Sequence, residues 1–444
     1  MTVYYGDETK KALKNFPFST HPTKMEFILA IVQIKKAAAI ANFKAGNFGK
    51  EIQDAIVKVC DEILAGKLNN QFPLSSFQGG AGTAIHMNVN EVIANRATEI
   101  LKTNPPASAM LKALRAGIHP NDHVNRSQST NDVNPSALKI AVFYLLQNLQ
   151  DKLFSLAETF QAKAEEFKNI NKLGRTHMQD AVLTTLGAEF LAYTENLKRY
   201  KTEIERAQEL CRVLNLGGTA IGNSINADPI YIKEVYKELN KNLGEKFYKA
   251  KNLMSKTGGQ TDFLIISQII TSMCVDLSKT ANDFKFMSSG PRGGIGEIIL
   301  PELQKGSSIM PGKVNPVMPE TVNQLYYLVS GNNLSIEHAV EGAQMELGVM
   351  IPIMADKLIE SVKMTTEVIH QFDKFCVAEI KADKEKCKMH LENSTAYATL
   401  LTPRLGYDAV SEIVKKSIST KKSLREIVVD EKYLTEKEFE EIIN

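Results

Sequence analysis

FLIISQIITSMCV, residues 263–275, would be apolar on more than one side if it were wound into a helix. The apolar positions of this region recur in steps of three, four or seven, at Phe263, Ile266, Ile270, Met273, Leu277 and Phe284. A helix that is apolar all round must be buried on all sides. The centre of a helix bundle, or the association of several bundles in an oligomer, would provide that burial. The sequence leaves both arrangements open.

Four other long segments have the same helical spacing. They lie at residues 138–160, 186–214, 322–336 and 358–372. We expect Asn134 and Pro135 to be the cap and the first helical residue of the first segment. Because five long helices in sequence are typical of a bundle, we predict an all-α chain with a central long-helix bundle over residues 131–385. A mostly helical N-terminal domain over residues 1–130 and a small C-terminal helical domain over residues 386–444 complete the predicted three-domain subunit.

The composition excludes several classes of function. The 53 basic and 51 acidic residues give a formal net charge of +2, so no basic surface suggests nucleic acid as a partner. The N-terminus is too polar for a signal peptide, and the apolar runs are too short to predict a membrane span. Five widely spaced cysteines without a CxxC pair predict reduced thiols and a cytoplasmic location.

Four polar segments interrupt the helical pattern. They are QGGAGTAIHMNVNE (78–91), HPNDHVNRSQSTND (119–132), GRTHMQD (174–180) and GSSIMPGKVNP (306–316). Glycine and proline predict that the last segment is a shaped loop. Each segment on its own reads as an ordinary capping loop, with Ser129, Thr130 and Asn131 just before a helix. Together they share hydroxyls, amides, a histidine or lysine and few carboxylates, which is the chemistry that an anionic substrate requires.

The histidines give one strong candidate. His177, between Thr176 and Gln179, is the best functional histidine, whereas His86, His338, His370 and His390 are expected to be structural. His119 and His123 have the spacing of a metal pair on a helix, but Pro120 argues against a regular helix there. We therefore expect no metal site.

The same polar blocks carry a family resemblance. GSSIMPGKVNP resembles the signature loop of the fumarase/aspartase superfamily, and GGAGT with MNVNEVIANR, HPNDHVN with SQSTND, GRTHMQDA and GGTAIG resemble its other blocks in the same order. The resemblance implies an all-α homotetramer whose core packs long helices from four subunits. It also implies active sites shared by three subunits, a small dicarboxylate substrate and elimination from a succinyl group to give fumarate. No organic cofactor or catalytic metal is implied, and no nucleic acid or membrane is expected as a partner.

The resemblance also implies roles for individual residues. Ser307 would be the base, acting as an alkoxide on a mobile loop with Gly306 and Gly312 as hinges. The carboxylate that is not activated would be held by Lys313 and Asn315. The activated, dianionic carboxylate would be contacted by Thr83, Ser129, Thr130 and Ser308. The leaving-group side would be lined by Asn131, Thr176 and His177, with Glu320 orienting His177.

The choice among members of the superfamily depends on smaller features. YYG near the N-terminus, QGGAG, STND and GKVNPVMPE look like the branch that deaminates L-aspartate. The alternatives are a class II fumarate hydratase, a related C–N lyase acting on another succinyl-amine, and a catalytically silent structural relative. Retention of Ser307, Lys313, Asn315 and His177 argues against the silent relative.

Several positions depart from the pattern of the superfamily. His86 stands where relatives usually have Asn, and it could reach the pocket or hydrogen-bond within its own loop. GNSIN (222–226), with Asn223, replaces GTGLN, and AQMELGVMIP lacks an Asn and a Glu near Gly348 and Ile351. These departures leave the substrate open, and the sequence does not decide whether residues 119–123 form an accessory dicarboxylate site.

Overall fold

A computed structural model of the chain describes residues 2–103 and 117–443, which are mostly helical, as predicted. In chain order the α-helices are α1 Asp7–Asn15, α2 Met25–Lys44, α3 Lys50–Leu64, α4 Thr83–Thr103, α5 Thr130–Glu166, α6 Leu186–Lys198, α7 Tyr200–Arg212, α8 Pro229–Leu243, α9 Leu253–Gly258, α10 Thr261–Met287, α11 Val317–Glu341, α12 Ile351–Phe375, α13 Lys384–Glu392, α14 Ala398–Leu405, α15 Tyr407–Thr420, α16 Leu424–Asp430 and α17 Glu436–Ile443. The short strands are β1 Asn171–Thr176, β2 Gln179–Thr185, β3 Val213–Leu214, β4 Tyr248–Lys249, β5 Ile298–Ile299 and β6 Lys381–Ala382. Short turns of helix are η1 Asn69–Gln71, η2 Gly80–Gly82, η4 Pro120–Val124, which is π-helical, and η5 Val377–Glu379.

The predicted long helical segments are present. Helices α5, α10, α11 and α12 have 37, 27, 25 and 25 residues. The segment predicted over residues 186–214 is divided into α6 and α7 at Arg199, whose backbone remains right-handed helical at φ −61° and ψ −29°. The helical spacing of apolar residues therefore located the long helices correctly.

The predicted start of α5 is wrong. The helix begins at Thr130, so Pro135 lies inside it and Asn134 is not its cap. A proline inside a helix leaves the carbonyl group four residues earlier without its N–H partner. Here that carbonyl belongs to Asn131, and the Asn215 side chain donates to it at 3.0 Å. A residue more than 80 positions away thus allows the helix to pass through the proline.

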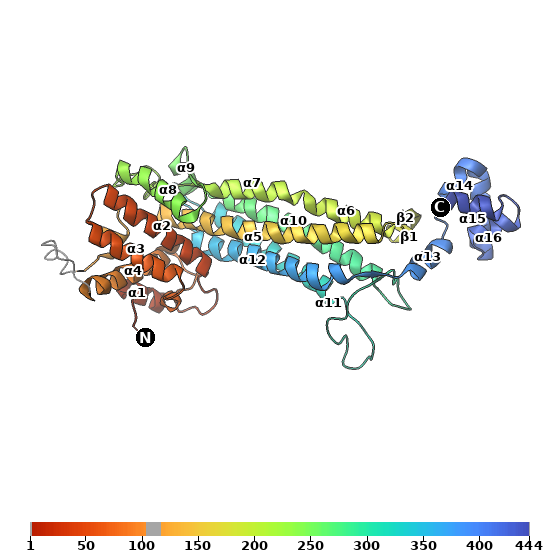
Figure 1. The fold of residues 1–444 in the computed structure, drawn as a ribbon, viewed down its shortest axis with the longest axis horizontal. Coiled ribbons are helices and arrows are strands. Elements are labelled where there is room, and N and C mark those ends of the chain that lie inside the picture. Colours follow the sequence, from red (N-terminus) through yellow and green to blue (C-terminus); the bar gives the residue numbers. More distant parts are fainter. Residues whose placement is uncertain (1, 104–116, 444) are drawn as a thin grey trace. The chain divides into compact units, whose positions relative to one another are not determined.

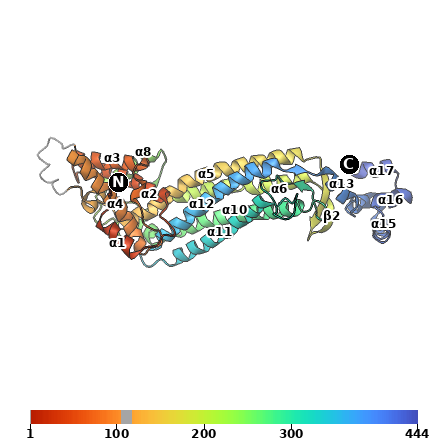
Figure 2. The same cartoon turned by 90° about the horizontal axis from the view of Figure 1, so that it is seen from below.

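The chain folds into two compact units, each built from several separate segments. Unit 1 combines residues 1–150, 201–272 and 327–366, and unit 2 combines residues 151–200, 273–326 and 367–444. The boundaries cut through the long helices, so they do not test the predicted three-domain division. Within each unit, segments of the long helices lie side by side (Figures 1 and 2).

Unit 1 contains α1–α4 and α8, with α2 beside both α3 and α8 (Figure 1). Its N-terminal segment is fixed by Glu91 of α4, whose carboxylate accepts hydrogen bonds from the N–H groups of Gly6, Glu8 and Thr9 at 2.9, 2.9 and 3.2 Å. A Cβ on Gly6 would lie 2.7 Å from a Glu91 oxygen. This close approach explains the glycine of the YYG segment.

Unit 2 contains an aromatic core and a separate C-terminal cluster. Phe160, Phe190, Tyr193, Phe284 and Phe372 form a group in which neighbouring ring centroids lie 5.6–6.4 Å apart. Helices α13–α17 gather buried apolar side chains into a second cluster, which also includes a residue of β1. The hairpin of β1 and β2 lies in this unit and was not predicted.

The apolar run of α10 was predicted to be too short to span a membrane, but the length and composition of the helix would suffice. Half of its most apolar window is buried within the chain. Since buried core helices of soluble proteins pass the same test, this is weak evidence for a membrane span.

Candidate active site

Ser307 lies in the long loop between β5 and α11 (Figure 1). Its Oγ accepts hydrogen bonds from the backbone N–H groups of Ile309 at 3.2 Å and Met310 at 3.1 Å. Two amide dipoles that converge on one oxygen favour negative charge on it. The start of α11 at Val317 lies on the same segment of chain. The local geometry therefore suits the alkoxide that a serine base requires.

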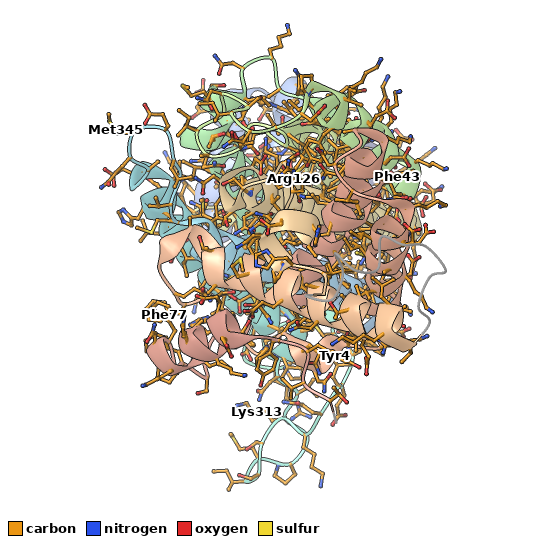
Figure 3. All side chains as sticks on the ribbon, turned by 90° about the vertical axis from the view of Figure 1, so that its left-hand side faces the viewer. Tyr4, Phe43, Phe77, Arg126, Lys313 and Met345 are labelled. Carbon is orange, nitrogen blue, oxygen red and sulfur yellow. The ribbon has the colours of Figure 1, made fainter. Side chains whose placement is uncertain are left out.

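The same loop carries the other predicted residues of the signature segment. Ser308 and Lys313 are exposed, and Lys313 stands on the open part of the loop (Figure 3). Asn315 is half-buried, and its Nδ2 donates to the Gly306 carbonyl at 2.5 Å. One amide hydrogen of Asn315 is thus used within the loop, so its second hydrogen or its oxygen must make any contact with a substrate.

His177 lies at the tip of the β1–β2 hairpin. Strand pairing runs up to Thr176 and Gln179, which leaves His177 and Met178 as the turn, with φ of 53° and 61°. A two-residue turn with positive φ at both positions matches the right-handed twist of the strands. His-Met lacks the Asn-Gly or Asp-Gly pattern of such turns, which is why the sequence suggested a loop. Thr176 and His177 are both exposed.

The base of this hairpin is fixed by a buried carboxylate. Glu297 is fully buried and forms ion pairs with Lys172 of β1 at 3.0 Å, Arg175 of β1 at 2.9 Å and His390 of α13 at 2.9 Å. Burial raises the pKa of Glu297, but these partners outweigh it and hold the net pKa below its ordinary value. The network gives the predicted structural histidine His390 its role, and it positions β1, the strand that leads into the turn at His177.

Glu320 occupies the first turn of α11 and is exposed. Its backbone N–H donates to the Pro316 carbonyl at 3.0 Å. Within the described ranges, no hydrogen bond or ion pair joins its carboxylate to His177. Its role in orienting His177 stays a prediction.

Thr83 begins α4 at the end of the glycine-rich turn, and its Oγ1 donates to the Gly80 carbonyl at 2.7 Å. Asn134 of α5 holds this turn by donating from Nδ2 to the carbonyl of Ala81 at 3.0 Å. A Cβ on Gly82 would lie 2.8 Å from that same Nδ2. Glycine is therefore required for the turn to approach α5, and the approach brings Thr83 to the N-terminal end of α5.

Ser129, Thr130 and Asn131 stand at this end of α5 and are half-buried. Asp132 organises them, because its carboxylate accepts the N–H groups of Ser129 at 2.9 Å, Gly217 at 3.0 Å and Thr219 at 3.0 Å. Burial raises the pKa of Asp132 to about 6, against the effect of these N–H groups and of the Lys35 charge. Asn131 donates from Nδ2 to the Ala220 carbonyl at 2.8 Å, which joins the GGTAIG block to this cluster.

The sequence reasoning missed Lys35, which is fully buried on α2. Its ammonium group contacts His86, and His86 contacts Thr130. Of the two alternatives for His86, hydrogen bonding within its own loop is therefore excluded, since its partners come from α2 and α5. A lysine within the apolar run ILAIVQIKKAAAIA was the available signal.

The remaining candidate positions have local roles. His119 Nδ1 accepts the Asp122 N–H at 3.2 Å, and His123 Nδ1 accepts the His119 N–H at 2.8 Å, so both histidines shape their own turn. Among the described residues, no group of three or more His, Cys, Asp or Glu could hold a metal ion. Whether residues 119–123 bind a dicarboxylate stays open.

The positions that depart from the superfamily pattern also have contacts. Asn223 Oδ1 accepts the Ile225 N–H at 3.3 Å. A Cβ on Gly348 would lie 2.4 Å from the Gln260 side chain. Ile351 is buried at the start of α12, next to Pro352, which lies near Gly82. Of these positions, Ile351 is the one that adjoins the glycine-rich turn, through Pro352.

The structure thus gathers the candidates into two groups. Unit 1 brings together Thr83, Ser129, Thr130 and Asn131 through Asn134, Asp132 and His86. Unit 2 contains Thr176 and His177 on the hairpin, and Ser307, Ser308, Lys313, Asn315 and Glu320 on or after the loop. One group offers hydroxyls and amides, and the other adds further hydroxyls, a lysine and a histidine.

Comparisons with known proteins show the family of the chain. Residues 2–331 match a protein family described as lyases, and residues 398–444 match one described as the fumarase C C-terminus. The chain is 42% identical to aspartate ammonia-lyase from a Bacillus species over 442 residues, which cover 100% of this chain and 93% of that protein.

Two solved structures extend the comparison. Fumarate lyase:delta crystallin from Brucella melitensis bound to cobalt is 40% identical with a TM-score of 0.93. Class II fumarase from Schistosoma mansoni is 32% identical with a TM-score of 0.93. Both alignments cover 100% of this chain and 95% of the other.

Proposed function

Because the chain belongs to the fumarase/aspartase family of lyases, we propose that it reversibly eliminates ammonia from L-aspartate to give fumarate. The observation that carries the proposal is the pair of amide N–H groups that converge on Ser307 Oγ at 3.1 and 3.2 Å. The full-length similarity to an aspartate ammonia-lyase supports aspartate as the substrate.

The chemistry of the proposed reaction is proton removal from carbon. Ser307, as the alkoxide, takes a proton from the carbon next to the side-chain carboxylate of aspartate. The electron pair that remains delocalises into this carboxylate, which becomes a dianionic aci-form. It then forms the carbon–carbon double bond while the carbon–nitrogen bond breaks, and the protonated amine leaves as neutral ammonia.

The developing dianion is where the protein contributes most, since interactions that strengthen in the transition state raise the rate. We assign the dianionic carboxylate to Thr83, Ser129, Thr130 and Ser308. The other carboxylate is assigned to Lys313 and Asn315, and the leaving ammonia to Asn131, Thr176 and His177. Hydroxyl and amide donors that are already fixed by hydrogen bonds, such as those at the start of α5, need little rearrangement when charge develops.

Assembly into a homotetramer forms part of the proposal, with each site built from three subunits. Helix α11 exposes Leu328 at 57% and Leu334 at 54%, and α10 exposes Val275 at 44%. Apolar side chains of this size on long helices are suited to burial against other copies of the chain. The contribution of several subunits would bring the unit 1 hydroxyls and the unit 2 base to a common substrate.

The test of the reaction is an assay of ultraviolet absorbance from fumarate, first with L-aspartate and then with L-malate. Formation of fumarate from aspartate, and its loss in Ser307→Ala, is the expected result. Light scattering on the same preparations measures the oligomer, for which we expect four copies. Fumarate from malate alone would overturn the assignment of substrate.

The second candidate is hydration of fumarate, and the similarity to the Schistosoma mansoni fumarase favours it. A C–N lyase for another succinyl-amine would act on neither substrate and would need a screen of such amines. A catalytically silent structural protein would act on none of these compounds. The cytoplasm is the proposed location, which suits five cysteines that are all buried and outside disulfides in the part of the chain that the structure describes.

A further inference from the structure

A chain of buried hydrogen bonds ends at Thr130. Lys35 of α2 and His86 of α4 are both fully buried, and Lys35 Nζ lies 2.6 Å from His86 Nε2. The other ring nitrogen, His86 Nδ1, lies 2.8 Å from Thr130 Oγ1 at the start of α5. Three elements that are far apart in sequence thus meet at one imidazole.

The partners of Lys35 define the direction of these bonds. Its ammonium group also donates to Asn125 Oδ1 at 2.9 Å and to Gln128 Oε1 at 3.0 Å. The three N–H bonds of an ammonium therefore match three acceptors, of which His86 Nε2 is one. A neutral imidazole that accepts at Nε2 carries its hydrogen on Nδ1, so His86 donates to Thr130 Oγ1.

The charges around the chain agree with this direction. Burial and the Lys35 charge lower the pKa of His86 well below its ordinary value, so the ring is neutral. Burial lowers the pKa of Lys35 to about 7, while Asp132 of α5 and Cys60 of α3 act to raise it. Uncharged His86 and charged Lys35, the pair of states that the hydrogen bonds require, are present together at pH below about 7.

The hydrogen bond from His86 determines how the Thr130 hydroxyl can use its own hydrogen. Its oxygen already accepts from His86, and among the described residues no carbonyl or carboxylate is found as an acceptor for the hydroxyl hydrogen. The hydroxyl is thus left to donate outward, and its donor strength rises because charge-assisted bonds polarise their neighbours.

We propose that Lys35 and His86 are positioning residues that hold the Thr130 hydroxyl as a hydrogen-bond donor to the dianionic carboxylate of the substrate. This inference rests on the proposed function, because it takes Thr130 to lie in the dicarboxylate site. In this proposal His86, which stands where relatives usually have Asn, acts in binding the carbanion rather than the ground-state substrate.

Two variants divide the roles of the His86 ring nitrogens. In His86→Asn, the amide nitrogen replaces Nδ1 as a donor to Thr130, but the contact with Lys35 is lost. In His86→Gln, the amide oxygen replaces Nε2 as an acceptor for Lys35, but the donor to Thr130 is lost. The control is Asn88→Ala, which removes another buried polar side chain of α4, one that donates to the Gln71 carbonyl.

The readout is the affinity of the full-length protein for two ligands, measured by calorimetry. The nitronate group of ionised 3-nitropropionate is planar and has formal negative charge on both oxygens, like the aci-carboxylate, whereas succinate resembles the ground state. We expect His86→Gln to weaken nitronate binding about 10- to 100-fold, with a much smaller change for succinate and a fall in kcat larger than any rise in KM. Asn88→Ala should keep the wild-type ratio of the two affinities. His86→Asn should lie between the control and His86→Gln, because it keeps the donor to Thr130 and loses the contact with Lys35.

A double-mutant cycle separates positioning from a general loss of stability. Thr130→Val removes the hydroxyl, so adding His86→Gln to it should weaken nitronate binding no further. Additive losses, or equal ratios in the Gln and Asn variants, would overturn the proposal. Melting temperatures of all variants show whether each one is folded.

The outcome also separates this proposal from the proposed reaction. If the wild type makes fumarate from aspartate while every variant keeps the affinity ratio, the positioning role fails and the reaction stands. If aspartate is not a substrate but the ratio changes as described, the reaction fails and the positioning role stands. No binding of nitronate to the wild type would overturn both.

Discussion

Gly306 and Asn315 close the loop that carries Ser307, with the Asn315 Nδ2 donating to the Gly306 carbonyl at 2.5 Å. The closure brings the backbone ends so close that a Cβ on Gly306 would lie 1.8 Å from the Lys313 carbonyl oxygen. Any residue other than glycine at this position therefore forces the loop out of the observed shape. The positions of the Ile309 and Met310 N–H groups, which donate to Ser307 Oγ, depend on that shape.

Gly306→Ala should reduce kcat/KM by roughly 100-fold, because a displacement of about 1 Å at a reacting group has an effect of that size. The matched control is Gly293→Ala, since Gly293 lies outside the loop and has nothing within 4 Å of an added Cβ. Steady-state kinetics measures both variants, and thermal unfolding should be unchanged in both. Equal activity of Gly306→Ala and wild type would show that the closed loop is not the active shape.

Ser307→Ala should reduce kcat by at least about 100- to 10,000-fold, the range for removal of a general base. The melting temperature should not change, because the loop is largely exposed and outside the cores of both units. Ser308→Ala is the comparison on the neighbouring hydroxyl and should lose less activity. A Ser307→Ala variant with normal turnover would rule out serine as the base.

Glu297→Ala should lower the free energy of unfolding by about 3 kcal/mol, because Arg175 loses its carboxylate partner and Lys172, which is buried, keeps only Glu189. Urea unfolding measures the change, with Glu302→Ala as the control on the exposed part of the same connection. Since the network supports β1, which leads into the turn at His177, activity should fall in Glu297→Ala even where the protein is folded. Equal stability of the two variants would contradict the role of the network.

The same carboxylate predicts a dependence on pH. The folded pKa of Glu297 is lower than its unfolded value, so its contribution to stability is present above the unfolded pKa and is lost as pH falls through the folded pKa. The stability difference between wild type and Glu297→Gln should therefore shrink on acidification below pH of about 4. A difference that grows on acidification would contradict this sign.

Lys35 predicts a rise of stability with pH as well, but in the alkaline range. Its folded pKa of about 7 lies below the ordinary value of 10.5, so between these two values the unfolded chain binds more protons and stability rises with pH. Lys35→Met should lose this rise relative to wild type, measured by urea unfolding from pH of about 7 to 10. The control Lys36→Met, at a lysine that pairs with Asp61 on the surface at 2.7 Å, should keep it.

Much of the fold could be predicted from local sequence. Apolar spacing located α5, α10, α11 and α12, and glycine and proline marked residues 306–316 as a loop. The hairpin at His177 escaped prediction because its turn residues carry no hairpin pattern. The polar blocks identified the candidate site residues, but not which of them would meet.

The sequence by itself therefore determined the long helices and the chemical character of the site, because helical periodicity and backbone freedom are properties of neighbouring residues. Tertiary structure alone decided that α5 passes through Pro135 with help from Asn215, and that Lys35 reaches His86 and His86 reaches Thr130. These contacts join residues 44 to 84 positions apart. Hydrogen bonds at such separations depend on how the helices pack, which no local pattern of residues contains.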